Sequence, residues 1–191
     1  MNDTDNIRPI LEASMANQRE AKQILGNMGY TYDPELSTNE SKVFIDKEGN
    51  PNIAFRGSKR VEDFLITDPL LAFGLEGFTT RFTTAKDLTK KVEEKYGKPA
   101  DAFGFSLGGS LAEKSGASGK IVTYNKGTGI LDIGRTIPKN QIDIRTPADK
   151  VSALATTQKH KYGNLVELDR PWSQDILTAH KINNLPNNFF V

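Results

Sequence analysis

The sequence predicts an α/β protein with a mostly parallel central sheet, an N-terminal β-hairpin and flanking helices. Short apolar runs alternate with segments of helical periodicity through most of the chain, as strands joined by crossover helices do. Before that alternation begins, two apolar runs flank a turn signal, which is typical of a hairpin. The chain has 191 residues, 37% of them hydrophobic and 26% charged, and is long enough to enclose a hydrophobic core.

The first segment predicts an amphipathic helix over residues 10–29, which a glycine ends. Its apolar residues recur near one face: Ile10, Leu11, Met15, Ile24 and Leu25. The next stretch, residues 30–40, is polar and contains a proline, which is typical of a linker. We therefore divide the chain into a helical extension with its linker, residues 1–38, and a main domain, residues 39–191.

The main domain begins with the hairpin, formed by residues 42–46 and 52–56 around the turn KEGNP. A helix is predicted over residues 79–97, because apolar residues recur there at helical spacing and a glycine follows. Four more strands are predicted at residues 100–105, 120–125, 141–146 and 164–169. A helix of small residues follows the first of these strands, and residues 173–185 predict a terminal helix or turn.

The most informative motif is GFSLG, residues 104–108, in which Ser106 lies between a predicted strand and a predicted helix. In a nucleophile elbow, this sharp turn raises the serine hydroxyl above the sheet and directs a helix N-terminus at it. Gly104 and Gly108 are expected where a side chain would strike a neighbouring element, and Gly109 lets the helix pack closely. The pattern favours Ser106 as a nucleophile; the alternative is a turn whose glycines serve packing alone.

A serine nucleophile needs an adjacent base, and the chain offers two histidines. His180 follows the last predicted strand, where α/β hydrolases bring their histidine over the nucleophile. His160 precedes that strand among lysines and is interpreted as a solvated loop residue. We therefore predict that His180 is the base.

For the acid that orients the histidine we predict Asp149. It lies just past the strand that ends near Arg145, at the sheet edge where loops face a ligand. Three other aspartates fit less well, because they lie inside that strand or beyond the next one: Asp143, Asp169 and Asp175. The alternative role for an aspartate here is a turn residue or a helix cap. The resulting order, Ser106, Asp149, His180, is that of the α/β hydrolases.

An oxyanion needs backbone N–H groups that already point toward the developing charge. We predict one from Leu107, directly after the nucleophile, and the other from Ser58 in the loop after the hairpin. The Ser58 hydroxyl is expected to hydrogen-bond within the site as well. The alternative for residues 56–58 is a polar strand end.

Composition excludes several other functions. The 25 basic and 24 acidic side chains are interspersed and give a net charge of +1, so no nucleic-acid partner is expected. With no cysteine and two histidines, we expect no disulfide, no metal site and no cofactor. Two glycine-rich stretches, residues 116–121 and 127–132, lack the spacing of a P-loop or a dinucleotide fingerprint.

The N-terminal stretch MNDTDNIRPI is acidic and polar, unlike a signal peptide, and the longest apolar run is too short to span a bilayer. We therefore expect the protein in the cytosol. The asparagine- and lysine-rich composition also suits proteins encoded by large DNA viruses and their satellites, so association with a virus particle is the alternative.

Beyond these single motifs, the chain resembles the class 3 lipases, the fungal-type triacylglycerol lipase family of the α/β hydrolase fold. The resemblance covers roughly residues 40–185 and rests on landmarks in the family's order. These are the oxyanion strand NIAFRGSK, the stretches DFLITD and EGFTTRF, the elbow GFSLGGSLA, the acid segment TPADKVS and the histidine segment LTAHKINNL. The chain departs from the family at Phe105, where a histidine commonly precedes the nucleophile.

The resemblance implies a serine carboxylic ester hydrolase that cleaves lipid acyl esters through an acyl-enzyme. Ser106 then attacks the ester carbonyl, His180 transfers its proton, Asp149 holds the imidazole, and Ser58 and Leu107 bind the oxyanion. A phospholipase and a small-ester esterase are alternatives within the same chemistry. A catalytically silent hydrolase fold, used as a binding or structural module, is the alternative from another class.

Candidate substrate-binding residues lie between the hairpin and the first helix of the main domain. In DPLLAFGL, the side chains of Leu70, Leu71 and Phe73 are expected to bind an acyl chain or to touch a membrane or lipid surface. The alternative is that they pack in the core. Phe105 is expected beside the substrate as well, and Trp172 either lines the pocket or anchors packing.

Overall fold

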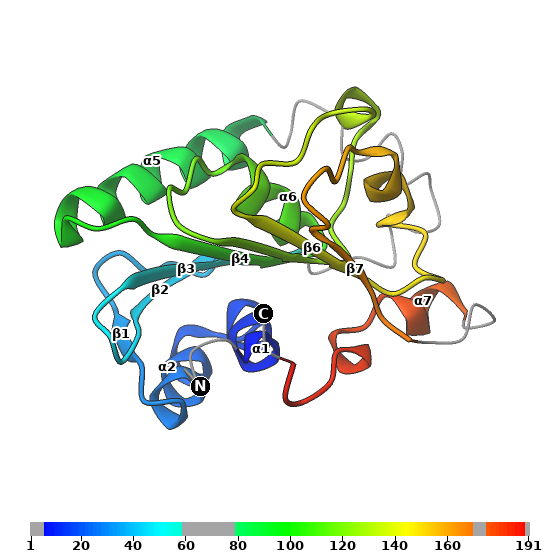
Figure 1. Ribbon diagram of the computed structural model, residues 1–191. Coiled ribbons are helices and arrows are strands. Elements are labelled where there is room, and N and C mark those ends of the chain that lie inside the picture. Colours follow the sequence, from blue (N-terminus) through cyan, green and yellow to red (C-terminus); the bar gives the residue numbers. More distant parts are fainter. Residues whose placement is uncertain (1–5, 59–78, 170–174, 190–191) are drawn as a thin grey trace.

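The computed structural model describes residues 6–58, 79–169 and 175–189, and it confirms the predicted α/β class (Figure 1). One seven-stranded sheet runs in chain order from β1 to β7. The first three strands pair antiparallel, and β3 to β7 pair parallel. The strands are β1 (Thr31–Asp33), β2 (Ser41–Ile45), β3 (Pro51–Phe55), β4 (Asp101–Phe105), β5 (Ile121–Tyr124), β6 (Gln141–Arg145) and β7 (Leu165–Glu167).

The helices α5 (Thr79–Tyr96) and α6 (Leu107–Lys114) lie together on one face of the sheet (Figure 1). Parallel strands that follow one another in chain order need right-handed crossovers, which place the connecting helices on the same side. The hydrophobic core on this face joins strands β2 and β3 to both helices. Its buried residues include Val43, Ile53, Phe55, Ala85, Val92 and Leu111.

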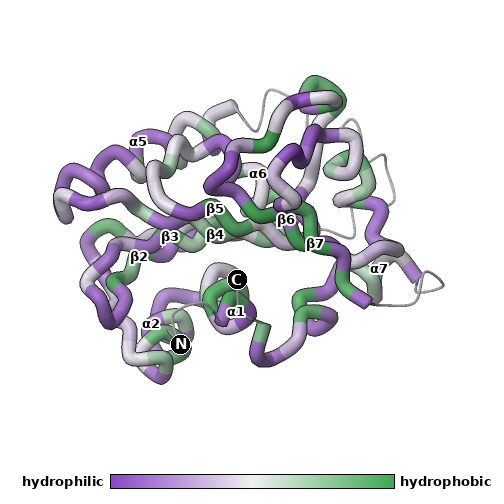
Figure 2. The backbone as a smooth tube through the Cα atoms, viewed as in Figure 1, coloured by the Kyte–Doolittle hydropathy of each residue, from purple (hydrophilic) through white to green (hydrophobic). Residues whose placement is uncertain are grey.

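The opposite face is covered by α1 (Ile7–Met15) and α2 (Gln18–Asn27), both from the N-terminal segment. Figure 2 shows that these helices and the strands contain apolar stretches, whereas much of α5 is hydrophilic. Buried residues of both helices join strand residues in a second core: Ile7, Ile10, Leu11, Ala21, Leu25, Phe44, Phe103 and Tyr124. Residues 7–27 therefore cover one face of the sheet.

The N-terminal segment differs from its prediction in two details. The single helix expected over residues 10–29 is two helices, because Ala16 is extended and the Asn17 side chain caps α2 by accepting from the Glu20 N–H at 3.0 Å. Within the predicted linker, residues 31–33 form β1, whose Tyr32 is buried.

Asp33 at the end of β1 fastens this edge of the sheet to α5. It accepts hydrogen bonds from Lys95 at 2.9 Å and from the Tyr96 hydroxyl at 2.6 Å. Burial raises the pKa of Asp33, but these two bonds and those from nearby backbone N–H groups outweigh it, so the pKa lies below its ordinary value. The edge strand is thus held by a charged contact that no local pattern predicted.

The carboxyl ends of β4, β5 and β6 meet at one edge of the sheet, in register through the pairs Phe105–Tyr124 and Tyr124–Ile144. In open α/β sheets this edge is where ligands bind. The loops beyond it carry η3 (Ile130–Asp132) and η4 (Ala153–Thr157), and α7 (Ile176–Ala179) and η5 (Ile182–Asn184) follow β7. In the part of the chain that the structure describes, no helix has both the length and the apolar character needed to cross a bilayer.

Candidate active site

Ser106 forms the sharp turn between β4 and α6 that the motif predicted. Its backbone has φ 57° and ψ −125°, a region that non-glycine residues rarely adopt and that costs about 1–3 kcal/mol. Hydrogen bonds hold this conformation: the Ser106 N–H donates to Tyr124 O at 3.0 Å, and Ser106 O accepts from Gly109 at 3.0 Å and from Gly127 at 3.1 Å. The Ser106 hydroxyl makes no capping hydrogen bond to the backbone N–H groups of α6.

The glycines of the motif let α6 pack directly on the strands beneath it. A Cβ atom on Gly104 would lie 2.0 Å from Gly108 O, and one on Gly108 would lie 2.2 Å from Phe55 O. On Gly109 it would lie 2.6 Å from Lys126 Cβ. Real Cβ atoms do not approach so closely, so these positions exclude any side chain. The predicted packing role of the glycines is confirmed, and it coexists with the strained serine.

Asp149 and His180 form a buried hydrogen-bonded pair. The His180 Nδ1 lies 2.8 Å from Asp149 Oδ1, and the two side chains are 4% and 0% exposed. Backbone N–H groups of Val151 and Ser152 donate to the same carboxylate at 3.3 and 2.9 Å. These two backbone N–H groups therefore hold the carboxylate in place, and the carboxylate fixes the orientation of the imidazole ring.

The His180 ring lies against the residue that precedes the serine. Its centroid is 4.9 Å from that of Phe105. Because Asp149 accepts at Nδ1, the neutral ring carries its proton there and leaves Nε2 as an acceptor. Nε2 is buried and has no hydrogen-bond partner among the described residues, so its bond to the Ser106 hydroxyl is not formed here. Such bonds are often long in an unliganded site and tighten when substrate binds.

The predicted oxyanion loop also reaches the serine. A Cβ on Gly57 would lie 3.4 Å from Ser106 Cβ and 2.8 Å from Phe105 O, so the chain after β3 passes directly over the elbow. Ser58, the next residue, is partly buried. Leu107 is the first residue of α6, and its N–H has no carbonyl to bind within the helix. Leu107 therefore follows Ser106 directly, and Gly57, the residue before Ser58, lies against Ser106.

The other predicted residues have different outcomes. Leu70, Leu71, Phe73 and Trp172 lie outside the described residues. Phe105 is buried and belongs to the core on the α1 face, where its ring also stacks on Tyr124 at 5.8 Å. Its placement beside a substrate stays a prediction.

A buried network of charges beneath α6 was not predicted. Lys126 donates to Glu113 and, at 2.6 Å, to Asp143, and all three side chains are at most 3% exposed. His160, interpreted from the sequence as a solvated loop residue, instead places Nε2 2.9 Å from Asp143. Arg135 completes the network by donating to Glu113 at 2.9 Å. Sequence spacing holds no signal for these contacts, because each joins residues from separate elements.

Asp143 is the most strongly perturbed member of this network. Burial raises its pKa, but hydrogen bonds from His160 and Gln141, together with the charge and hydrogen bond of Lys126, outweigh burial and lower the pKa to about 2. The folded state therefore favours the ionised carboxylate.

This shift predicts a loss of stability in acid. A lowered carboxyl pKa stabilises the fold above the ordinary value of 3.8, and that contribution disappears as the pH falls toward about 2. Converted from the pKa difference to free energy, this contribution to stability amounts to about 2 kcal/mol. In urea unfolding between pH 6 and pH 2, the difference in unfolding free energy between the wild type and Asp143→Asn is expected to shrink by this amount. A difference independent of pH would contradict the assignment.

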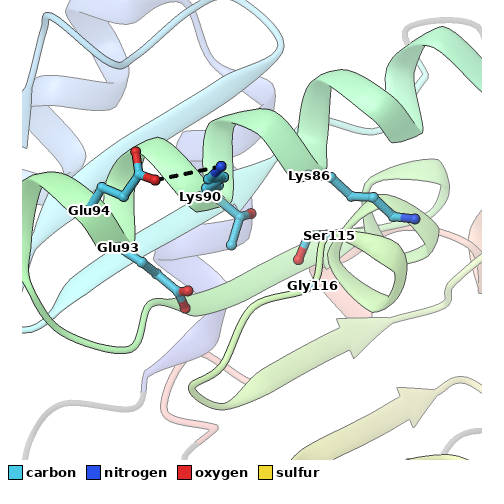
Figure 3. Close-up of a pocket in the computed structure, with 7 residues that line it drawn as sticks. Lys86, Lys90, Glu93, Glu94, Ser115 and Gly116 are labelled. Atoms are coloured by element: carbon cyan, nitrogen blue, oxygen red, sulfur yellow. Dashed lines mark ion pairs between the residues drawn. The ribbon is translucent and has the colours of Figure 1, made fainter.

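A surface cavity of about 490 Å³ lies at the other end of α6. Figure 3 shows that Lys86, Lys90 and Glu94 reach it from α5, while Ser115 and Gly116 border it after α6. Lys90 and Glu94 form an exposed ion pair at 3.7 Å. Since α6 is about 12 Å long, this cavity is separate from the elbow at Ser106.

Among residues 6–58, 79–169 and 175–189, no cluster of histidine, aspartate and glutamate side chains could hold a metal ion. Comparison with known proteins returned no matching family model, no matching curated protein and no matching solved structure.

Proposed function

We propose that the protein is a serine carboxylic ester hydrolase that cleaves lipid-like acyl esters. One observation carries the proposal: a strained serine lies at a helix N-terminus, and the ring of Phe105 directly before it packs against an imidazole whose Nδ1 contacts a buried carboxylate and whose Nε2 has no hydrogen-bond partner among the described residues. These are the parts of a nucleophile with an oriented base. The sequence resemblance to the class 3 lipases supports the same chemistry.

The proposed reaction follows from this arrangement of groups. Ser106 attacks the ester carbonyl carbon while His180 Nε2 takes the hydroxyl proton, and Asp149 stabilises the resulting imidazolium. The oxyanion lies toward the N–H groups of Leu107 and Ser58. His180 then donates the proton to the leaving alcohol, which leaves an acyl-enzyme on Ser106. Water attacks this ester, with His180 again as the base, and releases the acid.

An exposed apolar turn supports a lipid-like substrate. Ile130, Leu131 and Ile133 in and beside η3 are 51%, 92% and 51% exposed, and the loop begins at Gly127, which donates to Ser106 O. Between residues 126 and 163 every acidic side chain is buried, whereas five basic ones are exposed. An exposed apolar turn, in a stretch of chain whose exposed charges are cationic, is complementary to an anionic lipid surface.

The test of the nucleophile is labelling with a fluorophosphonate, followed by location of the adduct by mass spectrometry. We expect a single adduct on Ser106, lost in Ser106→Ala with an unchanged melting curve. Ser115→Ala is the matched control, because Ser115 is a buried serine at the other end of α6 and is expected to leave the labelling intact. A folded protein that takes no label, even with detergent or vesicles, would contradict the proposal and favour a silent binding module.

Substrate trials separate the remaining alternatives. A long-chain ester in phosphatidylglycerol vesicles, hydrolysed faster than in phosphatidylcholine vesicles and faster than a short soluble ester, supports lipase activity at an anionic surface. Release of fatty acid from the phospholipid itself indicates a phospholipase, and preference for the short ester indicates an esterase. Residence in the cytosol, with a virus particle as the alternative, stays a prediction.

A further inference from the structure

Asn125, the residue after β5, combines burial with an unusual backbone. It is 0% exposed and has φ 43°, and only Ser106 shares a positive φ among the described non-glycine residues. Its N–H donates to Ile144 O at 2.9 Å, which extends the pairing of β5 with β6 by one residue. Asparagine tolerates the left-handed backbone region better than most residues, so the backbone strain at Asn125 is small.

The Asn125 amide connects the two loops that carry the acid and the histidine. Its Oδ1 accepts from the Thr146 N–H at 2.7 Å, and Thr146 O in turn accepts from the Asp149 N–H at 3.0 Å. Its Nδ2 donates to Ala179 O at 3.1 Å, directly before His180. One side chain therefore ties the two loops at positions adjoining the residues that must meet.

Tyr124 holds the other side of the histidine. Its hydroxyl donates to Lys181 O at 3.2 Å and lies 2.9 Å from Thr146 Oγ1. Because that hydroxyl has one proton, Thr146 donates to Tyr124, while Thr146 Oγ1 accepts from Asn125 Nδ2 at 3.4 Å. A directional chain of hydrogen bonds thus runs from Asn125 through Thr146 and Tyr124 to the backbone, and the carbonyls on both sides of His180 are held.

We propose that Asn125, supported by Tyr124 and Thr146, is a positioning residue that sets the His180 ring against Asp149 and toward Ser106. The inference rests on the proposed hydrolase function for its kinetic consequence, but the positioning itself is independent of that function. Asn125 touches neither the ring nor the reacting atoms, and it acts through the backbone of both loops. Its neutral amide adds no charge that would disturb the pair.

The test uses Asn125→Asp, which keeps the shape and the acceptor toward Thr146 but turns the donor toward Ala179 O into a second acceptor. The matched control is Asn164→Asp, at a buried asparagine whose Nδ2 binds Pro138 O and Gln141 O at 3.0 and 2.7 Å, away from His180. Both variants are expected to lose stability. Only Asn125→Asp is expected to slow fluorophosphonate labelling of Ser106, by about 100-fold.

A spectroscopic readout separates this inference from the proposed function. The Nδ1 proton of His180, buried and bonded to Asp149, is expected to give a slowly exchanging low-field proton resonance in the wild type. Its loss in folded Asn125→Asp but not in Asn164→Asp supports the positioning role, even if no protein takes the label. A retained resonance in Asn125→Asp would overturn it. Asn125→Gly, which suits the left-handed backbone and adds no charge, is expected to lose the resonance as well, and it decides by the same criterion if Asn125→Asp does not fold.

Discussion

Replacing His180 by glutamine is expected to slow the reaction of Ser106 with a fluorophosphonate by on the order of 10⁴-fold, the upper range for loss of a general base. The same change at His160 is expected to leave the rate near that of the wild type. The two histidines form a matched pair, because one nitrogen of each ring contacts a buried aspartate. The distance is 2.8 Å for His180 Nδ1 and 2.9 Å for His160 Nε2. They differ in what the other ring nitrogen faces.

The His160 Nδ1 lies 3.2 Å from Gln158 O, whereas the His180 Nε2 has no partner within the described residues and lies on a ring packed against Phe105. Single-turnover labelling rates, measured on variants shown to be folded by circular dichroism, check the expectation. Rapid labelling of His180→Gln together with slow labelling of His160→Gln would assign the base to the buried network beneath α6 instead.

Introducing one methyl group at Gly108 is expected to destabilise the protein by more than about 4 kcal/mol, a large part of the stability of an ordinary domain. The Cβ would lie 2.2 Å from Phe55 O and 3.0 Å from Arg56 C and Gly57 N, all of them backbone atoms. No side chain can turn away to make room. Either α6 must lift from the sheet or β3 must move, and both elements are packed into the core.

Gly26→Ala is the matched control for Gly108→Ala. Gly26 lies in α2, and nothing lies within 4 Å of the place that its Cβ would take. Alanine suits a helix better than glycine does, so a gain of about 0.5 kcal/mol is expected. Urea unfolding followed by circular dichroism measures both variants. A Gly108→Ala protein as stable as the wild type would contradict the close packing of α6 on β3.

Several parts of the site could be predicted because their signals are local. The elbow needs a strand, a serine, small residues and a helix within about fifteen positions, and these requirements appear in the sequence between residues 101 and 114. The hairpin of β2 and β3 could be predicted in the same way, from a turn signal between two apolar runs. Chain order then selected His180 rather than His160, and the structure places His180 beside Asp149 and Phe105.

Other parts follow from contacts that no local pattern encodes. Asp143 fitted the role of the orienting acid less well than Asp149 only because it lies within a strand. No pattern near it in the sequence predicts its ion pair with Lys126. Residues 31–33 were interpreted as linker, since so short an edge strand, in a polar stretch with a proline, gains its pairing only from β2. The helices α1 and α2 have clear amphipathic patterns, yet amphipathicity does not say which surface they cover.

The sequence by itself therefore determined the α/β class, most element positions and the sharp turn at Ser106, because periodicity, turn chemistry and glycine spacing depend on neighbours a few residues away. Only the tertiary structure decided which face α1 and α2 cover, and it alone joined Asn125 to Ala179, 54 residues further along. It also supplied the geometry of the predicted contact between Asp149 and His180. Such contacts form when the carboxyl ends of parallel strands gather at one edge. Their geometry belongs to the packed sheet rather than to any segment of it.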